Sequence, residues 1–188
     1  MRAAREAWFE GQLDLDPDRL LLIDDTAANT SLARRYGRAP RGERCLMSVP
    51  QSRWKTTTVT AGLRAGGITA SWLLDGTMNG QASRTDVADV LAPTLQSGDT
   101  VVMDNLPAHK VSGIRERIEA MGGQAPLTPG PQPRLRAGRI GLCQAEGSAK
   151  RCGGGDHLRL SGAIGRSLNR FTPAACRAYP TAAGYDAT

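Results

Sequence analysis

The sequence predicts an α/β fold in which a sheet is flanked by helices, and three observations support this prediction. Two short apolar runs, 20–23 and 100–103, read as strands buried on both faces, and each is followed at once by aspartate. A segment rich in β-branched residues, 55–74, lies between them. Helical patterns cover 81–95 and 111–121. Strands interleaved with helices in this way are typical of α/β domains.

Length and composition indicate one globular domain. The chain has 188 residues, of which 40% are hydrophobic and 22% charged. No apolar run approaches the roughly 20 residues of a membrane helix, and the first eleven residues lack the apolar core of a secretory signal. We therefore expect a cytoplasmic protein with no membrane partner. None of the four cysteines has C-x-x-C spacing, which favours free thiols over a zinc site.

The first half of the chain predicts a strand, a loop and a hairpin. The strand over 20–23 is expected to end at Asp24-Asp25, and 26–53 reads as an arginine-rich loop. The segment 55–74 predicts a β-hairpin that turns at Gly66-Gly67.

The second half predicts helices around one further strand. The helix over 81–95 turns Val87, Val90 and Leu91 to one face, and Pro93 ends or kinks it. The strand 100–103 follows, then a helix over 111–121 with Ile114, Ile118 and Met121 on one face. Regular pattern returns only near residue 161, as a helix and a last short helix that reaches about residue 178.

Residues 124–160 have a composition unlike the rest of the chain. They contain six Arg or Lys and two acids, so they supply +4 of the net charge of +6. No Phe, Tyr or Trp occurs between Trp72 and Phe171, and 122–165 holds 11 of the 22 glycines. Because the excess charge belongs mainly to this one stretch, it is weak evidence for a nucleic-acid surface.

Asp24 and Asp104 are the candidate site, because each follows an apolar strand. Open α/β sheets bind ligands outside the carboxyl ends of their strands. If the two strands are neighbours, both carboxylates face a small cleft. Carboxylate oxygens suit Mg²⁺ or Mn²⁺, and a two-ion site activates a water or a 3′-hydroxyl against a phosphodiester. The spacing alone leaves open that both aspartates simply end strands.

Four separated motifs resemble one family. LLIDDTAANTSLARRYGRAPRGERC, WKTTTVTAGLR, LDGTMNG and VLAPTLQSGDTVVMDNLPAHK occur in that order. Together they closely resemble the catalytic domain of bacterial insertion-sequence transposases of the mariner-like superfamily, over residues 1–121 and again 161–188. The resemblance implies an RNase H-like mixed sheet flanked by helices, with a D-D-E or D-D-D triad that cleaves DNA and transfers strands.

The resemblance also assigns roles to residues. Asp24 and Asp104 look like the first two catalytic metal ligands of a Mg²⁺ or Mn²⁺ two-ion site, and Asp25 replaces the family's usual Glu. Asn105 and His109 look like supports near the scissile phosphate. The partners implied are transposon-end and target DNA, and a homodimer is left open. The candidate DNA contacts, for which a solvated basic face is the alternative, are Lys55, His109, Lys110, Arg34, Arg35 and Arg41.

The chain departs from the family in two places. It is expected to start after the helix-turn-helix region of full-length relatives. The third acid, which the family places about 35 residues after the second Asp, is also missing, since position 139 is Arg139. We hypothesise that about 124–160 is translated in a shifted frame, which disrupts the last core strand and the third-acid helix. A genuine insertion, in which Glu146 or Asp156 substitutes, is the alternative.

These observations predict a single transposase catalytic domain over 1–188, with 1–123 recognisable, 124–160 aberrant and 161–188 a helical end. We expect a metal-dependent DNA nuclease and strand transferase that is defective in this chain. A non-enzymatic remnant that binds DNA or intact transposase subunits is the alternative. Another RNase H-like nuclease, such as a resolvase, fits the WKTTT, DGTMNG and DNLPAHK motifs less well.

Overall fold

The computed structural model describes residues 15–29, 36–46, 55–126 and 157–183. Four strands form one sheet: β1 (Leu20–Asn29), β2 (Thr56–Arg64), β3 (Gly67–Asp75) and β4 (Thr100–Met103). The helical elements are α2 (Gly80–Thr85), η1 (Asp86–Leu91), η2 (Ala92–Thr94), η3 (Pro107–Lys110), α3 (Ile114–Ala120), α5 (His157–Leu168) and α6 (Pro173–Ala183). No helix among these residues is long and apolar enough to cross a membrane.

The sheet is mixed, with strand order β3-β2-β1-β4. β1 pairs antiparallel with β2, and β2 pairs antiparallel with β3 across the predicted hairpin. β1 and β4 run parallel, and the last pair in their register is Ile23 with Met103. The prediction of an α/β fold is therefore confirmed, and the strands that contain 20–23 and 100–103 are neighbours.

The prediction that the first strand ends at Asp24-Asp25 is wrong. β1 continues to Asn29, with Asp24 opposite Ala61 and Asp25 opposite Thr60 of β2. The backbone pairing with β2 carries the strand beyond the point where its apolar pattern stops. Because successive side chains of a strand point to opposite faces, the two aspartates diverge across the sheet.

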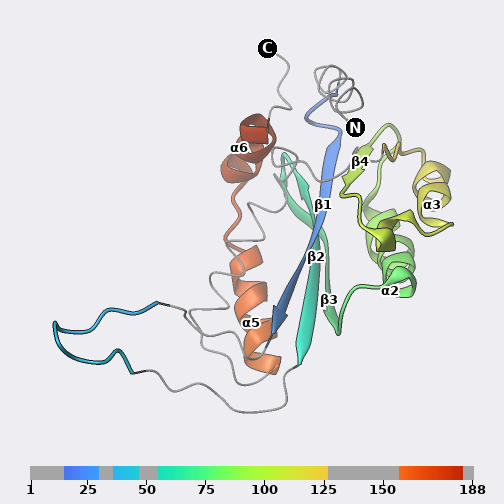
Figure 1. Ribbon diagram of the computed structural model, residues 1–188. Coiled ribbons are helices and arrows are strands. Elements are labelled where there is room, and N and C mark those ends of the chain that lie inside the picture. Colours follow the sequence, from blue (N-terminus) through green and yellow to red (C-terminus); the bar gives the residue numbers. More distant parts are fainter. Residues whose placement is uncertain (1–14, 30–35, 47–54, 127–156, 184–188) are drawn as a thin grey trace, which may run out of the picture.

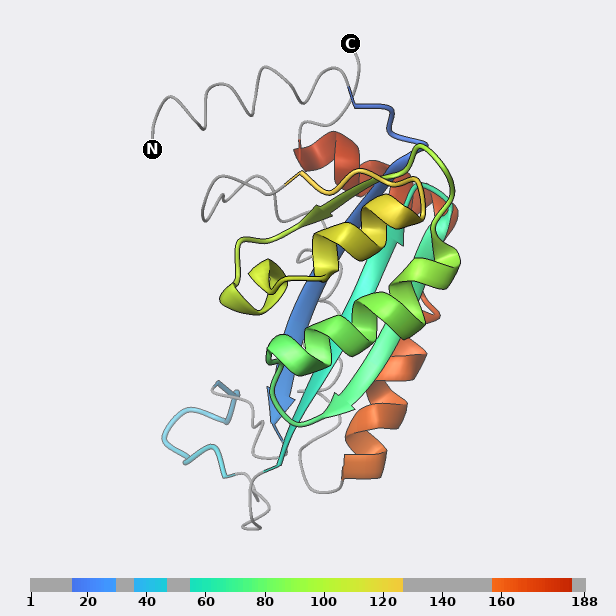
Figure 2. The ribbon, with the colours of Figure 1, turned by 90° about the vertical axis from the view of Figure 1, so that its right-hand side faces the viewer.

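Helices cover both faces of the sheet (Figures 1 and 2). The face with α2, η1 and α3 buries a cluster that includes Leu21, Ile23 and Ile118. The face with α5 and α6 buries two smaller clusters, in which Leu22 packs near Cys176, and Ala61 near Ile164. Odd-numbered residues of β1 therefore face α2 and α3, and even-numbered residues face α5 and α6.

The predicted helices are confirmed in type, and their ends differ. The helix expected over 81–95 is one continuous helical stretch from Gly80 to Thr94, whose middle segment η1 is a π-helix and whose end at Pro93 is a 3-10 turn. α3 begins only at Ile114, because Gly113 in a left-handed conformation precedes it. Ile114 and Ile118 are buried as expected, whereas Met121 is exposed.

A further backbone pairing begins beside β4. After α3 the chain returns, and Gln124 forms a parallel bridge with Thr100 through hydrogen bonds of 2.7 and 2.8 Å to Val101 and Asp99. The prediction of a disrupted core strand after this point, the shifted frame and the candidate acids Glu146 and Asp156 fall on 127–156, outside the described residues.

Candidate metal centre

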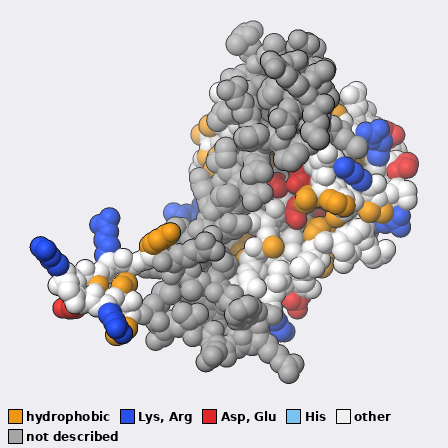
Figure 3. Space-filling model, viewed as in Figure 1, with side chains coloured by type: hydrophobic (Ala, Val, Ile, Leu, Met, Phe, Trp, Pro, Cys, Tyr) orange, Lys and Arg blue, Asp and Glu red, His pale blue; other side chains and the backbone are white. Residues whose placement is uncertain are grey.

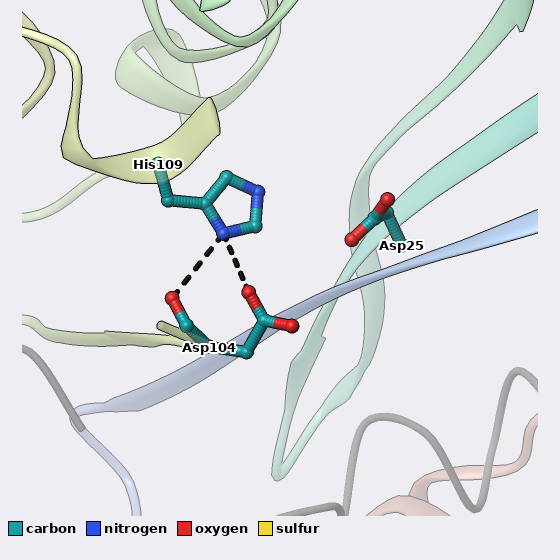
Figure 4. A group of neighbouring side chains, drawn as sticks. All are labelled: Asp25, Asp104 and His109. Carbon is teal, nitrogen blue, oxygen red and sulfur yellow. Dashed lines mark hydrogen bonds and ion pairs between the residues drawn. The ribbon is translucent and has the colours of Figure 1, made fainter. Parts of the chain in front are cut away.

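Asp25, Asp104 and His109 form a group whose potential ligand atoms all lie within 4.8 Å of one another. Figure 4 shows Asp104 between His109 and Asp25, with the two carboxylates facing the same space. Asp25 comes from the middle of β1, Asp104 follows β4, and His109 lies in η3. Two carboxylates and an imidazole at this distance could hold a divalent cation.

Local structure fixes the Asp104 carboxylate. The parallel register of β1 and β4 brings the end of β4 to the level of the two β1 aspartates. The backbone N–H of Leu106 donates to Asp104 Oδ1 (3.2 Å), and His109 Nδ1 lies 2.8 Å from the same oxygen. His109 is buried, whereas the side chain of Asp104 is 43% exposed. The histidine thus orients a carboxylate that stays open to solvent.

The site favours positive charge on the His109 ring. Burial alone would lower the pKa of His109, but the hydrogen bond to Asp104 and the negative charges of Asp104 and Asp25 outweigh it and raise this pKa above its ordinary value. A protonated ring partly neutralises the two carboxylates when no cation is bound.

A further carboxyl group lies behind these residues. Asp86, the first residue of η1, is 5% exposed. Burial raises its pKa to about 6, the positive charge of His109 lowers it, and the negative charge of Asp25 raises it. Asp86 is therefore close enough to both residues to interact with them electrostatically, although it lies outside the 4.8 Å group.

An open hollow of about 490 Å³ adjoins Asp25. Its lining is mainly apolar, with Thr58, Thr77 and Asn79 among the polar side chains. Figure 3 shows acidic side chains gathered beside hydrophobic ones on the face of the molecule seen in Figure 1. The hollow gives a ligand a path to the Asp25 carboxylate.

The structure brings only part of the predicted site together. Asp104 and His109 lie in the group together with Asp25, whereas Asp24 is not part of it. Asp24 is buried, and its Oδ1 accepts a hydrogen bond from the backbone N–H of Asp25 (2.9 Å). Alternation along β1 places the side chain of Asp24 on the α5 and α6 face, and the expectation that it faces Asp104 across a cleft stays a prediction.

The candidate DNA contacts are spread over the surface. Lys55, Lys110 and Arg41 are exposed. His109 is buried against Asp104, so its position is that of a support for the carboxylate. Arg34 and Arg35 lie outside the described residues.

Sequence reasoning missed Asp25 as a member of this group and Asp86 as a buried carboxyl group near it. The continuation of β1 through TAAN, with its β-branched Thr26, was the available signal for Asp25. The signal for Asp86 was weak: this acid begins a helical segment in which Val87 and Leu91, one and five residues later, are buried.

A match to a family model shows the class of protein to which this fold belongs. The family model of the DDE superfamily endonucleases matches residues 19–136, and the chain belongs to this family. No curated protein matches the chain in sequence.

Solved structures of the Mos1 mariner transposase share the fold. The Mos1 mariner paired end complex with Mn matches with a TM-score of 0.77 and 14% identity, over 97% of this chain and 58% of that one. The pre-cleavage Mos1 transpososome matches with a TM-score of 0.76 and 13% identity, over 98% of this chain and 59% of that one. The catalytic domain of the Mos1 mariner transposase alone matches with a TM-score of 0.67 and 12% identity, over 98% of this chain and 87% of that one. The chain thus spans about three fifths of the longer Mos1 chains, and the predicted RNase H-like fold is confirmed.

Proposed function

We propose that this chain is the catalytic domain of an insertion-sequence transposase, which binds Mg²⁺ or Mn²⁺ and cleaves DNA at a phosphodiester. The observation that carries the proposal is the Asp25, Asp104 and His109 group at the edge of a DDE endonuclease fold. The matched Mos1 structures include complexes with Mn and with Mg, as well as a strand transfer complex. DNA is accordingly the proposed substrate.

Asp104 is the proposed shared ligand, with one aspartate of β1 on each side of it. The register ends at Ile23 and Met103, so the next residues along the two strands are Asp24 and Asp104. Asp25 meets Asp104 on the α2 face, and Asp24 lies on the α5 face. We propose that Asp24 and Asp25 would each help Asp104 to hold the ions of a two-ion site.

The protein's own groups then have distinct roles in cleavage. When bound, the ions activate the attacking oxygen and stabilise the leaving oxygen. Asp104 would hold the ions at the open edge, and His109 fixes the direction of its carboxylate. We expect strand transfer to be weak in this chain, because no acid occupies the position of the family's third ligand, where Arg139 stands.

Mn²⁺ titration by calorimetry, together with nicking of supercoiled DNA, tests these roles. We expect two ions per wild-type chain, one per chain in Asp24→Asn and in Asp25→Asn, and none in Asp104→Asn. Asp89→Asn is the matched control, because Asp89 is an exposed carboxylate on η1.

The results of these two measurements distinguish the proposed metal-dependent nuclease from its alternatives. Full binding by Asp104→Asn would refute the metal centre. If only one of the variants Asp24→Asn and Asp25→Asn still bound two Mn²⁺ ions, the aspartate replaced in that variant would not be a ligand, and the other aspartate would remain in the site with Asp104. Metal and DNA binding without any nicking would favour the alternative of a non-enzymatic remnant that binds DNA.

A further inference from the structure

The connection between β1 and β2 is much longer than the fold requires. Asn29, the last residue of β1, pairs with Thr56, the first residue of β2, so the two strand ends already lie side by side. Antiparallel neighbours are usually joined by about two to five residues, whereas residues 30–55 join these two strands. Long connections in compact domains usually have a function, so this one calls for an explanation.

This connection also carries the excess charge of the chain. Residues 30–55 contain six Arg and one Lys but a single acid, Glu43, so their charge is +6. The whole chain has 24 basic and 18 acidic residues, which leaves 17 of each outside this connection. The +4 of residues 124–160 is thus balanced by acids elsewhere, whereas the charge of 30–55 equals the net charge of the protein.

The described part of this connection, 36–46, stands clear of the rest of the molecule, and we call it the arm. All of its residues are exposed, and Tyr36 and Leu46 are 90% and 88% exposed. Figures 1 and 2 show the arm projecting away from the sheet and the helices. Its shape is local, since the backbone N–H of Glu43 donates to the oxygen of Pro40 (3.0 Å) across a turn with Gly42 at φ +91°.

Three arginines of the arm are free to bind an anion. Arg38, Arg41 and Arg44 are exposed, and within the described part of the chain none of their guanidinium groups forms a hydrogen bond or an ion pair. Figure 3 shows Lys and Arg side chains pointing outward from the projecting part of the molecule. A guanidinium group binds phosphate through two parallel hydrogen bonds. The arm therefore has the chemistry that suits a chain of phosphates.

The arm lies within reach of DNA bound at the metal centre. β1 continues from Asp25 to Asn29 before the connection begins, which is about 13 Å at roughly 3.3 Å per residue. One strand of duplex DNA advances about 3.4 Å per nucleotide. Phosphates only a few nucleotides from the cleaved one are therefore close enough to meet the arm.

We propose that the arm, 36–46, contacts the DNA backbone, and that Arg38, Arg41 and Arg44 bind phosphates beside the cleavage site. The proposal rests on the proposed function, because that function makes DNA the substrate. Such contacts position a duplex without reading its sequence. A second copy of the chain suits the arm less well, because each copy carries a net charge of +6, of the same sign as the arm.

The salt dependence of duplex binding tests the arm. The variant carries Arg38→Gln, Arg41→Gln and Arg44→Gln together, and fluorescence anisotropy measures binding of a labelled duplex in EDTA, so that no metal ion contributes. Between about 50 and 200 mM KCl, each phosphate contact adds nearly one unit to the slope of log Kd against log salt concentration. We expect the slope to fall by about three in the variant. An unchanged slope would overturn the proposal.

Two further variants distinguish phosphate contacts from a general loss of charge. Glutamine at Arg117, Arg166 and Arg170, which are exposed on or next to α3 and α5, removes the same charge and should change the slope by less than about one. Lysine at the three arm positions keeps the charge, so the slope should remain while binding weakens, because lysine cannot form the paired hydrogen bonds. An equal loss of slope in the α3 and α5 variant, or a loss of slope in the lysine variant, would contradict the proposal.

The same proteins separate this proposal from the proposed function. If wild type nicked DNA in Mn²⁺ while the arm variant kept the full slope, the arm contact would fail and the proposed function would stand. If wild type neither bound Mn²⁺ nor nicked DNA while the arm variant still lost the slope, the proposed function would fail and the arm contact would stand. An arm variant that bound DNA as wild type but no longer self-associated in sedimentation would make the arm an interface between copies and overturn the proposal.

Discussion

The two ends of the four-residue strand β4 carry aspartates with opposite environments. Asp99 immediately precedes the strand, and Asp104 immediately follows it. Asp99 is fully buried and forms an ion pair with Arg64 at 2.5 Å. Asp104 is half exposed and faces another carboxylate, Asp25. The residue type is the same, but its charge is compensated at one end and concentrated at the other.

The neighbours decide what each carboxylate can do. Burial alone would raise the pKa of Asp99, but hydrogen bonds from the Arg64 guanidinium and from the backbone N–H of Gln96, together with the charge of Arg64, outweigh it and lower this pKa. All of these partners belong to the fold, so Asp99 has no capacity for a ligand. At the Asp104 end, two acids share a histidine, which leaves room for a cation. The contrast assigns stability to the first end and the candidate metal centre to the second.

The largest expected effect lies at the Asp99 end. Arg64→Met leaves Asp99 as a buried, unpaired charge, and we expect it to lower the free energy of unfolding by about 3 kcal/mol. Urea denaturation at neutral pH measures this change. Mn²⁺ affinity should be unaffected wherever the variant is folded, because the pair lies at the opposite end of β4 from the metal centre.

A control with an exposed ion pair sharpens that result. Glu119→Gln removes a 4.0 Å pair with Arg115, in which both side chains are more than half exposed. It should cost less than about 0.5 kcal/mol. Similar losses for the two variants would mean that Asp99 is not specifically held by Arg64.

The next effect lies at the Asp104 end, where a cation should supply the missing compensation. At free Mn²⁺ of about 100 times its dissociation constant, a single-site linkage raises the free energy of unfolding by about 2.7 kcal/mol. Urea denaturation of wild type with and without Mn²⁺ measures this gain, and Asp104→Asn should abolish it. Equal stabilisation of wild type and variant would place the ion elsewhere on the chain.

Comparing sequence with structure shows which signals were local and which were not. The strands 20–23 and 100–103, the hairpin and the helix after Gly80 follow from short-range patterns, and each lies where it was predicted. The true end of β1 could not be predicted in that way, because pairing with β2 sets it. One step along a strand changes the face, so the continuation of β1 separates Asp24 and Asp25 onto opposite faces of the sheet.

Asp86 shows the same limit more strongly. Its place beside Asp25 and His109 depends on how η1 lies across the sheet, and η1 and β1 are far apart in sequence. Its one-dimensional context is an ordinary helical pattern, with Thr85 before it and Val87 after it. Only the packing of the helix turns that acid inward, so no periodicity in the sequence separates it from exposed Asp89.

The smallest expected effect concerns the pH dependence of stability that Asp86 causes in the metal-free protein. Its pKa is raised from 3.8 to about 6, so between these values the folded state binds more protons than the unfolded state. Stability therefore falls as pH rises through this window, and the loss is complete above about pH 6. Asp86→Asn lacks this term, so the stability of wild type relative to the variant should decline from pH 4 to pH 6.

Urea denaturation at several pH values between 4 and 7 measures that difference, with Asp89→Asn as the control that should show none. The charged groups that act on Asp86 are His109 and Asp25, with opposite signs. A wild-type advantage that instead grew with pH would mean that attraction to His109 exceeds the cost of burying the Asp86 charge. In that case Asp86 would resemble Asp99, and the division of β4 into a compensated and an uncompensated end would no longer hold.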